Sequence, residues 1–477
     1  MRYINRTDLL IVVRNLSRIM IGIGVLCLIP IIVDLIYLEF NLIGFLIPAL
    51  ISIGLGYGIS VTFKNYSHKR MSLKHGMIIS ALAWLWAAII GGLAMYLITQ
   101  HCFVDAVFES MSALTGSGVT LYPNVEILPY SILFFRALQQ WIGGLGIIVM
   151  IIAILTRPGN ASSRLYQSEA REERLKPSVK ATLVQTIKIY GIYTALGIVL
   201  YLIAGMPLFD SICNTFTTIS TGGMSIKNAN IGYYQSDAIY LITMLLMILG
   251  ATSFLVHYNV IRTRGKSLIQ DLQFKVMISI IAIVTVLLYF TTKIMPMEIV
   301  FTVVSAITTT GASIQSSSTL AGWPSFVIIC LMVLMLMGGS SGSTVGAIKL
   351  KRLIIFFKGI YKHIREIMSP EGRVVPIKMA NKKISEKVVS DSGNYITLYL
   401  ICILLTWALF CFYGHDPFNS FFDTISIQSN VGLSTGVITP ALEMPLKIIG
   451  IFNMWTGRLE IYPVLITLRA MFEIFKR

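Results

Sequence analysis

The sequence predicts an all-α polytopic membrane protein, with an N-terminal helix pair followed by four helix–loop–helix repeats. Three observations lead to this fold class: the number and length of the apolar runs, the placement of basic residues, and a short polar loop that occurs four times. Of the 477 residues, 55% are apolar and 13% are charged. Soluble domains carry about 25% charged residues, so the composition excludes a soluble protein.

Ten apolar runs are long enough to cross a hydrocarbon core, which requires roughly 20 residues of α-helix. Two runs form the N-terminal pair, at 9–38 and 42–63. The others form four pairs: 77–99 with 132–156, 183–203 with 239–261, 274–292 with 326–357, and 395–413 with 446–472. The predicted units are a helix pair at 1–70, repeats at 71–160, 177–265, 270–360 and 391–477, and a basic cytoplasmic loop at 361–390.

Basic residues gather on one side of this ten-span arrangement. Of the 38 Lys and Arg residues, 32 lie in the first 18 residues, at 64–74, 157–180, 262–275 and 349–387, or at the C-terminus. Because Lys and Arg concentrate in cytoplasmic loops, this side and both termini are predicted to be cytoplasmic. The net charge of +16 therefore indicates membrane orientation, and no nucleic-acid partner is predicted.

The opposite, outer side carries mostly acids: Asp34, Glu39, Asp105, Glu109, Glu126, Asp210, Asp237, Glu298, Asp416, Asp423 and Glu443, against Arg136, Lys227, Lys293 and Lys447. Two interpretations stay open. The acids could line a vestibule that concentrates cations, or they could fill outer loops that tolerate them. Arg136 is expected to pair with an acid of an outer loop.

Catalytic and cofactor sites have no support in the sequence. The six cysteines and six histidines lack metal-ligand spacing, so neither zinc nor a disulfide framework is predicted. A membrane enzyme would also need paired carboxylates or a nucleophile beside a base, and no such group is evident. We therefore expect that the chain is not an enzyme and binds no cofactor.

One polar segment recurs between the helices of every pair, on the outer side. Its copies read SALTGSGVT at 112–120, TTISTGGMS at 217–225, SAITTTGAS at 305–313 and SIQSNVGLS at 426–434. They align on four glycines, each followed by an apolar residue and then Ser or Thr: Gly118, Gly223, Gly311 and Gly432. One such segment would fit an ordinary helix packing face. Four copies in register indicate a repeated structure with a common role.

About eleven helical residues before each glycine would rise roughly 16 Å, or half of the hydrocarbon thickness. Each loop is thus predicted to enter as a half-helix and return extended. The residues thirteen positions before the glycines are expected to cap the half-helices: Asp105, Asp210, Glu298 and Asn419. Extended backbone at this depth must line water or pack on protein. Four returns around a central pore would supply rings of carbonyl oxygens that replace the hydration shell of a monovalent cation.

Together these features resemble the Trk/Ktr/HKT superfamily of potassium transport proteins, most closely its bacterial TrkH-like pore subunits. QQWIGGLGI at 139–147 and GRLE at 457–460 add to the resemblance. The family pattern implies a potassium selectivity filter formed by Gly116, Ser117, Gly118, Thr221, Gly222, Gly223, Thr309, Thr310, Gly311, Asn430, Val431 and Gly432. In the family, Ser at the first of the aligned glycines accompanies sodium selectivity, so Gly118 fits the potassium pattern. The fourth loop departs most, because Asn430 and Val431 precede its glycine.

A glycine-rich segment, GGSSGSTVGA at 338–347, interrupts the run at 326–357. Four glycines in ten residues break a helix, and a break at membrane depth must line a cavity or pack on protein. A close helix–helix contact is the alternative. We call residues 338–347 the intramembrane loop. The resemblance implies that it obstructs the pore below the filter, with gate residues Gly338, Gly339, Ser340, Ser341, Gly342, Ser343, Thr344, Gly346 and Arg458.

Arg458 lies in the middle of the last predicted span, where an uncompensated charge costs about 2.5–3.5 kcal/mol on insertion scales. Facing the pore, it would raise a barrier to cations and could bind a carboxylate or loop carbonyls. Glu460 is two residues on, hence on another face, and is not its expected partner. The family places an arginine with this gating role here. A structural ion pair or a snorkelling side chain is the alternative.

By resemblance, the chain is expected to be a potassium uptake subunit that conducts K⁺ and Rb⁺ down their electrochemical gradient across the bacterial cytoplasmic (inner) membrane. A potential of 100 mV supplies about 2.3 kcal/mol per charge. A Na⁺- or H⁺-coupled symporter of the same fold is the alternative, although four repeats of one orientation favour a channel-like pore. The resemblance also implies a homodimer within membrane lipid, and cytosolic TrkA-like nucleotide-binding regulatory subunits on the basic loops.

Overall fold

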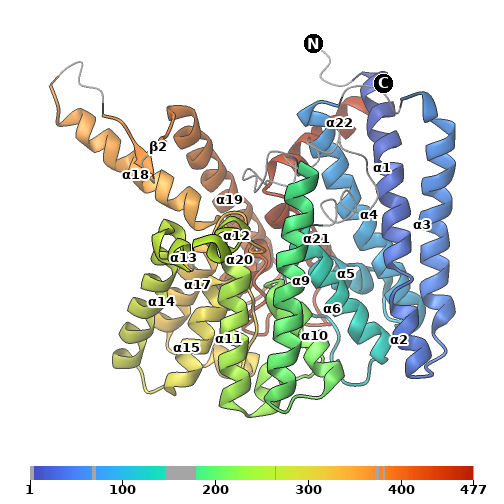
Figure 1. Ribbon diagram of the computed structural model, residues 1–477, viewed down its shortest axis with the longest axis horizontal. Helices are drawn as coiled ribbons and strands as arrows, with labels where there is room; N and C mark the ends of the chain where they lie inside the picture. Colours follow the sequence, from blue (N-terminus) through green and yellow to red (C-terminus); the bar gives the residue numbers. More distant parts are fainter. Residues whose placement is uncertain are drawn as a thin grey trace.

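The computed structural model of the chain describes residues 5–66, 71–146, 179–263, 265–370, 375–379 and 382–475. In these residues all regular secondary structure is helical apart from a two-stranded antiparallel hairpin, β1 (Lys378–Met379) and β2 (Lys382–Lys383). The second part of the predicted span 132–156 and nearly all of the basic segment 157–180 lie outside the described residues. Most helices stand side by side with their axes roughly parallel (Figure 1).

The N-terminal pair consists of α1 (Arg6–Leu26) with α2 (Pro30–Ile36) as one interrupted span, and α3 (Leu42–Thr62), which ends at η1 (Lys64–Tyr66). Glycines let α1 and α3 approach closely. A Cβ on Gly56 would lie 2.7 Å from the Ser17 carbonyl oxygen, and one on Gly24 would lie 2.8 Å from that of Ala49. Small residues at a contact are the usual way in which helices pack within lipid.

Each repeat contains a long first helix, a half-helix, an extended return and a second helix. The first helices are α4 (Leu73–Thr99), α9 (Val179–Ile203), α14 (Leu272–Thr291) and α19 (Glu386–Phe412). The half-helices are α5 (Phe103–Thr115), α10 (Leu208–Ile219), α15 (Pro296–Ile307) and α20 (Pro417–Ser429). The second helices are α6 (Tyr130–Leu145), α11 (Asp237–Ala251) with α12 (Phe254–Thr263), α17 (Ser325–Met337) with α18 (Leu350–Ile367), and α21 (Met444–Arg458) with α22 (Tyr462–Phe475). Short helices η2 (Asn230–Tyr234), α13 (Lys266–Gln270) and α16 (Ser317–Ala321) join them.

The second helices of repeats two and four are broken where single spans were predicted. Among the described residues, six helices are long and apolar enough to cross a membrane, or seven if α11 and α12, bent by 105°, count as one span. The predicted span 446–472 is likewise two helices, because Glu460 and Ile461 adopt φ of 62° and 59° between α21 and α22. The break at 338–347 is where the sequence places it.

The expected capping of the half-helices is wrong in position. Asp105, Asp210, Glu298 and Asn419 are the third residues of their helices, and the N-caps are Cys102, Pro207, Met295 and Asp416. Only Asp416 of these four caps accepts a side-chain hydrogen bond, from the Asn419 N–H. An acid in the first helical turn still lies at the positive end of the helix dipole, so its favourable interaction with the dipole is retained.

The half-helices lie in the interior of the protein, and the outer helices face lipid. The residues ten positions before the aligned glycines are at most 1% exposed: Phe108, Cys213, Phe301 and Phe422. On α14, by contrast, Ile283 and Phe290 are 66% and 79% exposed. Apolar side chains are thus both inside and outside, as expected of a protein in a bilayer. The start of α1, the end of α22, and α18 with its hairpin lie at one end of the helices (Figure 1).

Candidate functional site

The four loop ends meet in a closed ring inside the protein. A Cβ added to Gly118 would overlap the carbonyl oxygen of Gly222 in the second repeat, and one added to Gly223 would overlap that of Thr310 in the third. Likewise Gly311 abuts the Val431 carbonyl, and Gly432 abuts that of Ser117. Each repeat therefore touches the next, and the fourth returns to the first. We call Gly118, Gly223, Gly311 and Gly432 the glycine ring.

Two independent constraints require glycine at these four positions. Their φ angles are 77°, 67°, 73° and 100°, in the left-handed region that side chains disfavour. In addition, the space that a side chain would need is filled by a carbonyl oxygen of the neighbouring repeat. The structure thus brings together the filter residues that the sequence predicted in all four loops, and it explains why the aligned residue is glycine.

Every half-helix ends with the same turn. The N–H groups of Ser117, Gly222, Thr310 and Val431 bond to the carbonyls five residues earlier, at 3.0, 2.8, 3.0 and 2.9 Å. This is the Schellman motif, whose central residue is left-handed. The central residues, which we call the inner residues, are Gly116, Thr221, Thr309 and Asn430, with φ of 75°, 52°, 52° and 52°. Gly and Asn suit this position, and the two threonines do not.

A buried carboxylate supports the return segment in two repeats. Glu109 of α5 accepts hydrogen bonds from the Thr120 hydroxyl (2.9 Å) and the Leu121 N–H (3.0 Å), and it pairs with Arg136 of α6 at 2.7 Å. Arg136 does pair with an outer-side acid, but that acid belongs to the half-helix. Asp423, at the same position in α20, accepts bonds from Ser434, Thr435, Val437 and Ile438.

Neutral residues occupy the corresponding position in the other two repeats. Asn214 of α10 donates to the Tyr234 hydroxyl at 3.0 Å, and the Thr302 hydroxyl of α15 accepts from Gln315 Nε2 at 2.8 Å. The second repeat has a further support that sequence reasoning missed: Gln140 donates to the Gly222 carbonyl (2.8 Å) and accepts from the Met224 N–H (3.1 Å). Gln140 lies in the stretch 139–147, and this position was the sequence signal that could have identified it.

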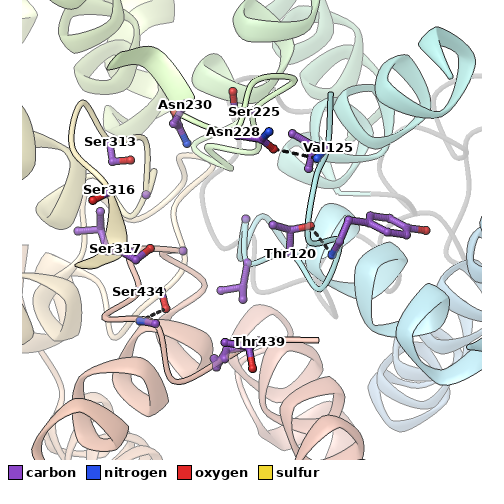
Figure 2. A pocket seen from close by; sticks show the side chains of 18 of the residues that line it. Thr120, Val125, Ser225, Asn228, Asn230, Ser313, Ser316, Ser317, Ser434 and Thr439 are labelled. Atoms are coloured by element: carbon purple, nitrogen blue, oxygen red, sulfur yellow. Dashed lines mark hydrogen bonds between the residues drawn. The ribbon is translucent and has the colours of Figure 1, made fainter. Parts of the chain in front are cut away.

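A cavity of about 430 Å³ opens above the glycine ring. Hydroxyl residues two positions after each ring glycine line it from all four repeats (Figure 2): Thr120, Ser225, Ser313 and Ser434. The charged residues that line it are Arg136 and Lys227, and none of the described lining residues is acidic. Of the two interpretations of the outer acids, the acid-lined vestibule therefore does not apply to this cavity. Outer acids instead support backbone or pair with bases, as Asp105 does with Lys447 at 2.7 Å.

The intramembrane loop fills the break in the second helix of repeat two. Its Ser340 N–H donates to the Ala251 carbonyl at 3.0 Å, and the Phe254 N–H donates to the Gly342 carbonyl at 3.0 Å. Of the predicted gate hydroxyls, Ser343 bonds to the Ser340 carbonyl at 2.6 Å. Ser340 and Thr344 are at most 1% exposed. The loop is thus tightly packed, and its backbone groups are held by α11 and α12.

Arg458 bridges three repeats directly below the half-helices. From the end of α21 it donates to the Thr344 carbonyl of the intramembrane loop at 2.5 Å, and to the carbonyls of Gly143 (2.5 Å) and Gly144 (3.0 Å) at the end of α6. Carbonyls are therefore among its partners, as the sequence allowed. Glu460 pairs instead with Lys349, at 2.8 Å, and with Arg352.

Further glycines bring the second helices against the C-terminal ends of the half-helices. A Cβ on Gly143 would overlap the Leu114 carbonyl, one on Gly250 would lie 2.6 Å from that of Ile219, and one on Gly457 would overlap that of Gln428. These three carbonyls lie four residues before the ring glycines. The contacts were not predicted from the sequence, although two of the glycines belong to the stretches 139–147 and 457–460. Among the described residues, no group of His, Cys, Asp and Glu could hold a metal ion.

Many membrane-crossing helices around a central ring of re-entrant loop ends define a polytopic membrane transport protein. The family model described as TrkH, a cation transport protein, matches residues 45–295 and 292–474. The chain therefore belongs to the TrkH family of cation transport proteins. Its members are transporters, not enzymes.

Relatives match over almost the whole chain. An uncharacterized cation transporter of Methanocaldococcus jannaschii is 39% identical over 451 residues, covering 94% of this chain and 93% of its own. The Trk system potassium uptake protein TrkH of Escherichia coli is 28% identical over 440 residues, covering 88% and 90%. The crystal structure of the potassium transporter TrkH from Vibrio parahaemolyticus superposes with a TM-score of 0.86 at 26% identity, covering 97% and 99%.

Proposed function

We propose that this protein takes up K⁺, and also conducts Rb⁺, by passive flow through the ring of four loop ends. The observation that carries the proposal is the closure of the glycine ring, in which each ring glycine lies against a carbonyl oxygen of a neighbouring repeat and all four repeats take part. Carbonyl rings can replace the hydration shell of a monovalent cation. Two of the relatives bear names that assign them potassium transport. The ion ligands would be the carbonyls of residues 116–118, 221–223, 309–311 and 430–432.

The intramembrane loop and Arg458 would form the gate on the inner side of this filter. Arg458 adds a positive charge beside the path, which raises the barrier to a cation. Its bonds to Thr344, Gly143 and Gly144 tie the plug to two helix ends, and this supports a closed state. Opening would then require these bonds to break and the loop to leave the path.

A soluble nucleotide-binding regulator would supply the energy for opening. The intramembrane loop continues into α18, which with β1 and β2 projects beyond the other helices (Figure 1). This segment belongs to the basic region 349–387, so we assign this end of the protein to the cytoplasm, with both termini. A partner that moves α18 would pull directly on the plug. Two protomers in a cytoplasmic membrane complete the proposed assembly.

The decisive experiment measures ion flux into liposomes that contain the purified protein, under an imposed potential, with K⁺, Rb⁺ and Na⁺ compared. Gly118→Ser should lose the preference for K⁺, because its side chain would meet the Gly222 carbonyl. Gly205→Ser is the matched control: Gly205 also has a left-handed φ, 88°, but a Cβ there meets open space. The proposal would be refuted if the wild-type protein showed no K⁺ flux, or if the Gly118→Ser variant kept the wild-type ion preference.

The gate is tested separately with Arg458→Gln. Removing the charge and its carbonyl bonds should increase K⁺ flux in the absence of any soluble partner, while the preference for K⁺ over Na⁺ is retained. Arg469→Gln, on a side chain that is 68% exposed, controls for the loss of a positive charge. Flux that stays at the wild-type level in Arg458→Gln would remove Arg458 from the gate.

A further inference from the structure

Two of the inner residues are threonines in a backbone conformation that threonine rarely adopts. Thr221 and Thr309 both have φ of 52°, at the position where the first and fourth loops carry Gly116 and Asn430. A β-branched residue with positive φ is a true outlier, since its branched Cβ crowds the backbone. Contacts with neighbouring residues must stabilise this conformation, and the hydrogen bonds of the two side chains identify these contacts.

Both threonine hydroxyls are hydrogen-bonded to the intramembrane loop. The hydroxyl oxygen of Thr221 lies 3.0 Å from that of Thr344, and the Thr309 hydroxyl accepts from the Gly346 N–H at 3.1 Å. All three threonines are at most 2% exposed, so water does not compete for these bonds. The plug therefore touches the innermost residues of the loop ends through specific polar contacts.

The loop side of these contacts is itself firmly held. The Thr344 hydroxyl also donates to the Gly250 carbonyl at 3.0 Å, and the Thr344 carbonyl accepts from Arg458 at 2.5 Å. Arg458, the intramembrane loop and the inner residues of repeats two and three thus form one continuous hydrogen-bonded network. A displacement of the loop cannot occur without releasing the two inner threonines.

The first and fourth repeats lack this side-chain connection. Gly116 has no side chain, and the loop reaches the fourth repeat through backbone, where the Ala347 N–H donates to the Ser429 carbonyl at 3.1 Å. Asn430, with its amide oriented to suit its neighbours, accepts from the Arg458 N–H at 3.0 Å. The polar side-chain contacts between plug and inner residues therefore come from repeats two and three.

We propose that the intramembrane loop is a structural part of the selectivity filter, in which Thr344 and Gly346 hold Thr221 and Thr309 in their left-handed conformation. Thr344 is then a positioning residue, because it determines how the second loop presents its carbonyls. Changes in the loop should alter ion preference as well as the amount of flux. This inference rests on the proposed function of the filter and the gate.

The test compares Thr344→Val with Thr344→Ser in the same liposome assay. Valine keeps the shape and removes the hydroxyl, whereas serine keeps the hydroxyl. Thr344→Val should lower the K⁺:Na⁺ flux ratio about fivefold, the change that losing one buried hydrogen bond of ordinary strength supports. Thr344→Ser should keep the wild-type ratio. Thr221→Val should lower the ratio similarly, and the double valine variant should lower it by less than the two single effects combined, because both single changes remove the Thr221–Thr344 bond.

The readout separates this inference from simpler roles and from the proposed function. A plug that merely blocks the path predicts higher flux in Thr344→Val with the wild-type K⁺:Na⁺ ratio, and that result would overturn the inference while leaving the filter intact. Additive losses in the double variant would also overturn it. If the wild-type protein carried no K⁺, or Gly118→Ser kept the wild-type preference, the proposed function itself would be refuted.

Discussion

In the first and fourth repeats, a buried carboxylate of the half-helix supports the return segment. In the second and third repeats, the intramembrane loop supports the inner residue. Behind the returns of repeats one and four lie the buried carboxylates Glu109 and Asp423, where repeats two and three have Asn214 and Thr302. At the inner residues the pattern reverses, because only repeats two and three place hydroxyls against the intramembrane loop. One backbone turn, repeated four times, is thus stabilised in two ways.

This difference shows that four equivalent loop ends in one chain can be stabilised by two separate kinds of contact. In repeats one and four, charged hydrogen bonds to backbone fix the return whatever the plug does, since none of these bonds involves residues 338–347. In repeats two and three the support includes the plug. We therefore expect substitutions behind the returns to act on stability most strongly in repeats one and four.

The largest effect is expected for Glu109→Gln. It leaves the Arg136 guanidinium, 2% exposed, without its carboxylate, and breaking a buried pair in this way costs about 3–5 kcal/mol. The midpoint of thermal unfolding in detergent, followed by loss of the monodisperse peak in size-exclusion chromatography, should fall further than in Asp423→Asn or Thr302→Val. Adding Arg136→Gln should restore part of the loss, because no unpaired charge is left.

Asp423→Asn should rank second. The amide keeps the shape but replaces one acceptor oxygen with a donor that faces the N–H groups of the return, and it leaves no buried charge unpaired. A loss of about 3 kcal/mol follows from hydrogen bonds to a charged group. The same unfolding measurement checks it, with Asp416→Asn, at the exposed start of α20, as the matched control. A change no larger than the control's would contradict the anchoring role.

Thr302→Val should have the smallest effect, about 1 kcal/mol, because it removes one neutral hydrogen bond to Gln315. Thr302→Ser keeps that bond and should unfold close to the wild type. If Thr302→Val lowered the unfolding midpoint as far as Glu109→Gln, the distinction between the two kinds of repeat would collapse.

The repeats and the glycine positions were readable from the sequence because they depend on local pattern. Four aligned glycines between apolar runs predict four equivalent re-entrant loops, and the family membership agrees with the fold class. The half-helix starts were misplaced by three residues because an acid is favourable both at the cap and in the first turn. Pro296 and Pro417 at the first helical position were the better markers.

What the sequence could not supply is the direction in which side chains face. It placed acids on the outer side, but whether Glu109 points into the cavity or toward Arg136 depends on packing between repeats. It indicated one broken helix, where four glycines lie together, and missed the others, because Thr252–Ser253 and Leu459–Ile461 contain no strong helix breaker. Those breaks are set by tertiary contacts such as the bond from the Phe254 N–H to the Gly342 carbonyl.

The contact between Gly432 and the Ser117 carbonyl has a consequence for biosynthesis. A ribosome delivers the first loop to the membrane long before the fourth exists, so until the last helix pair inserts, the first loop has a neighbour on one side only. A chain interrupted during translation carries an open arc instead of a closed circle. The closed ring that the proposed function requires would therefore exist only once the fourth repeat is in place.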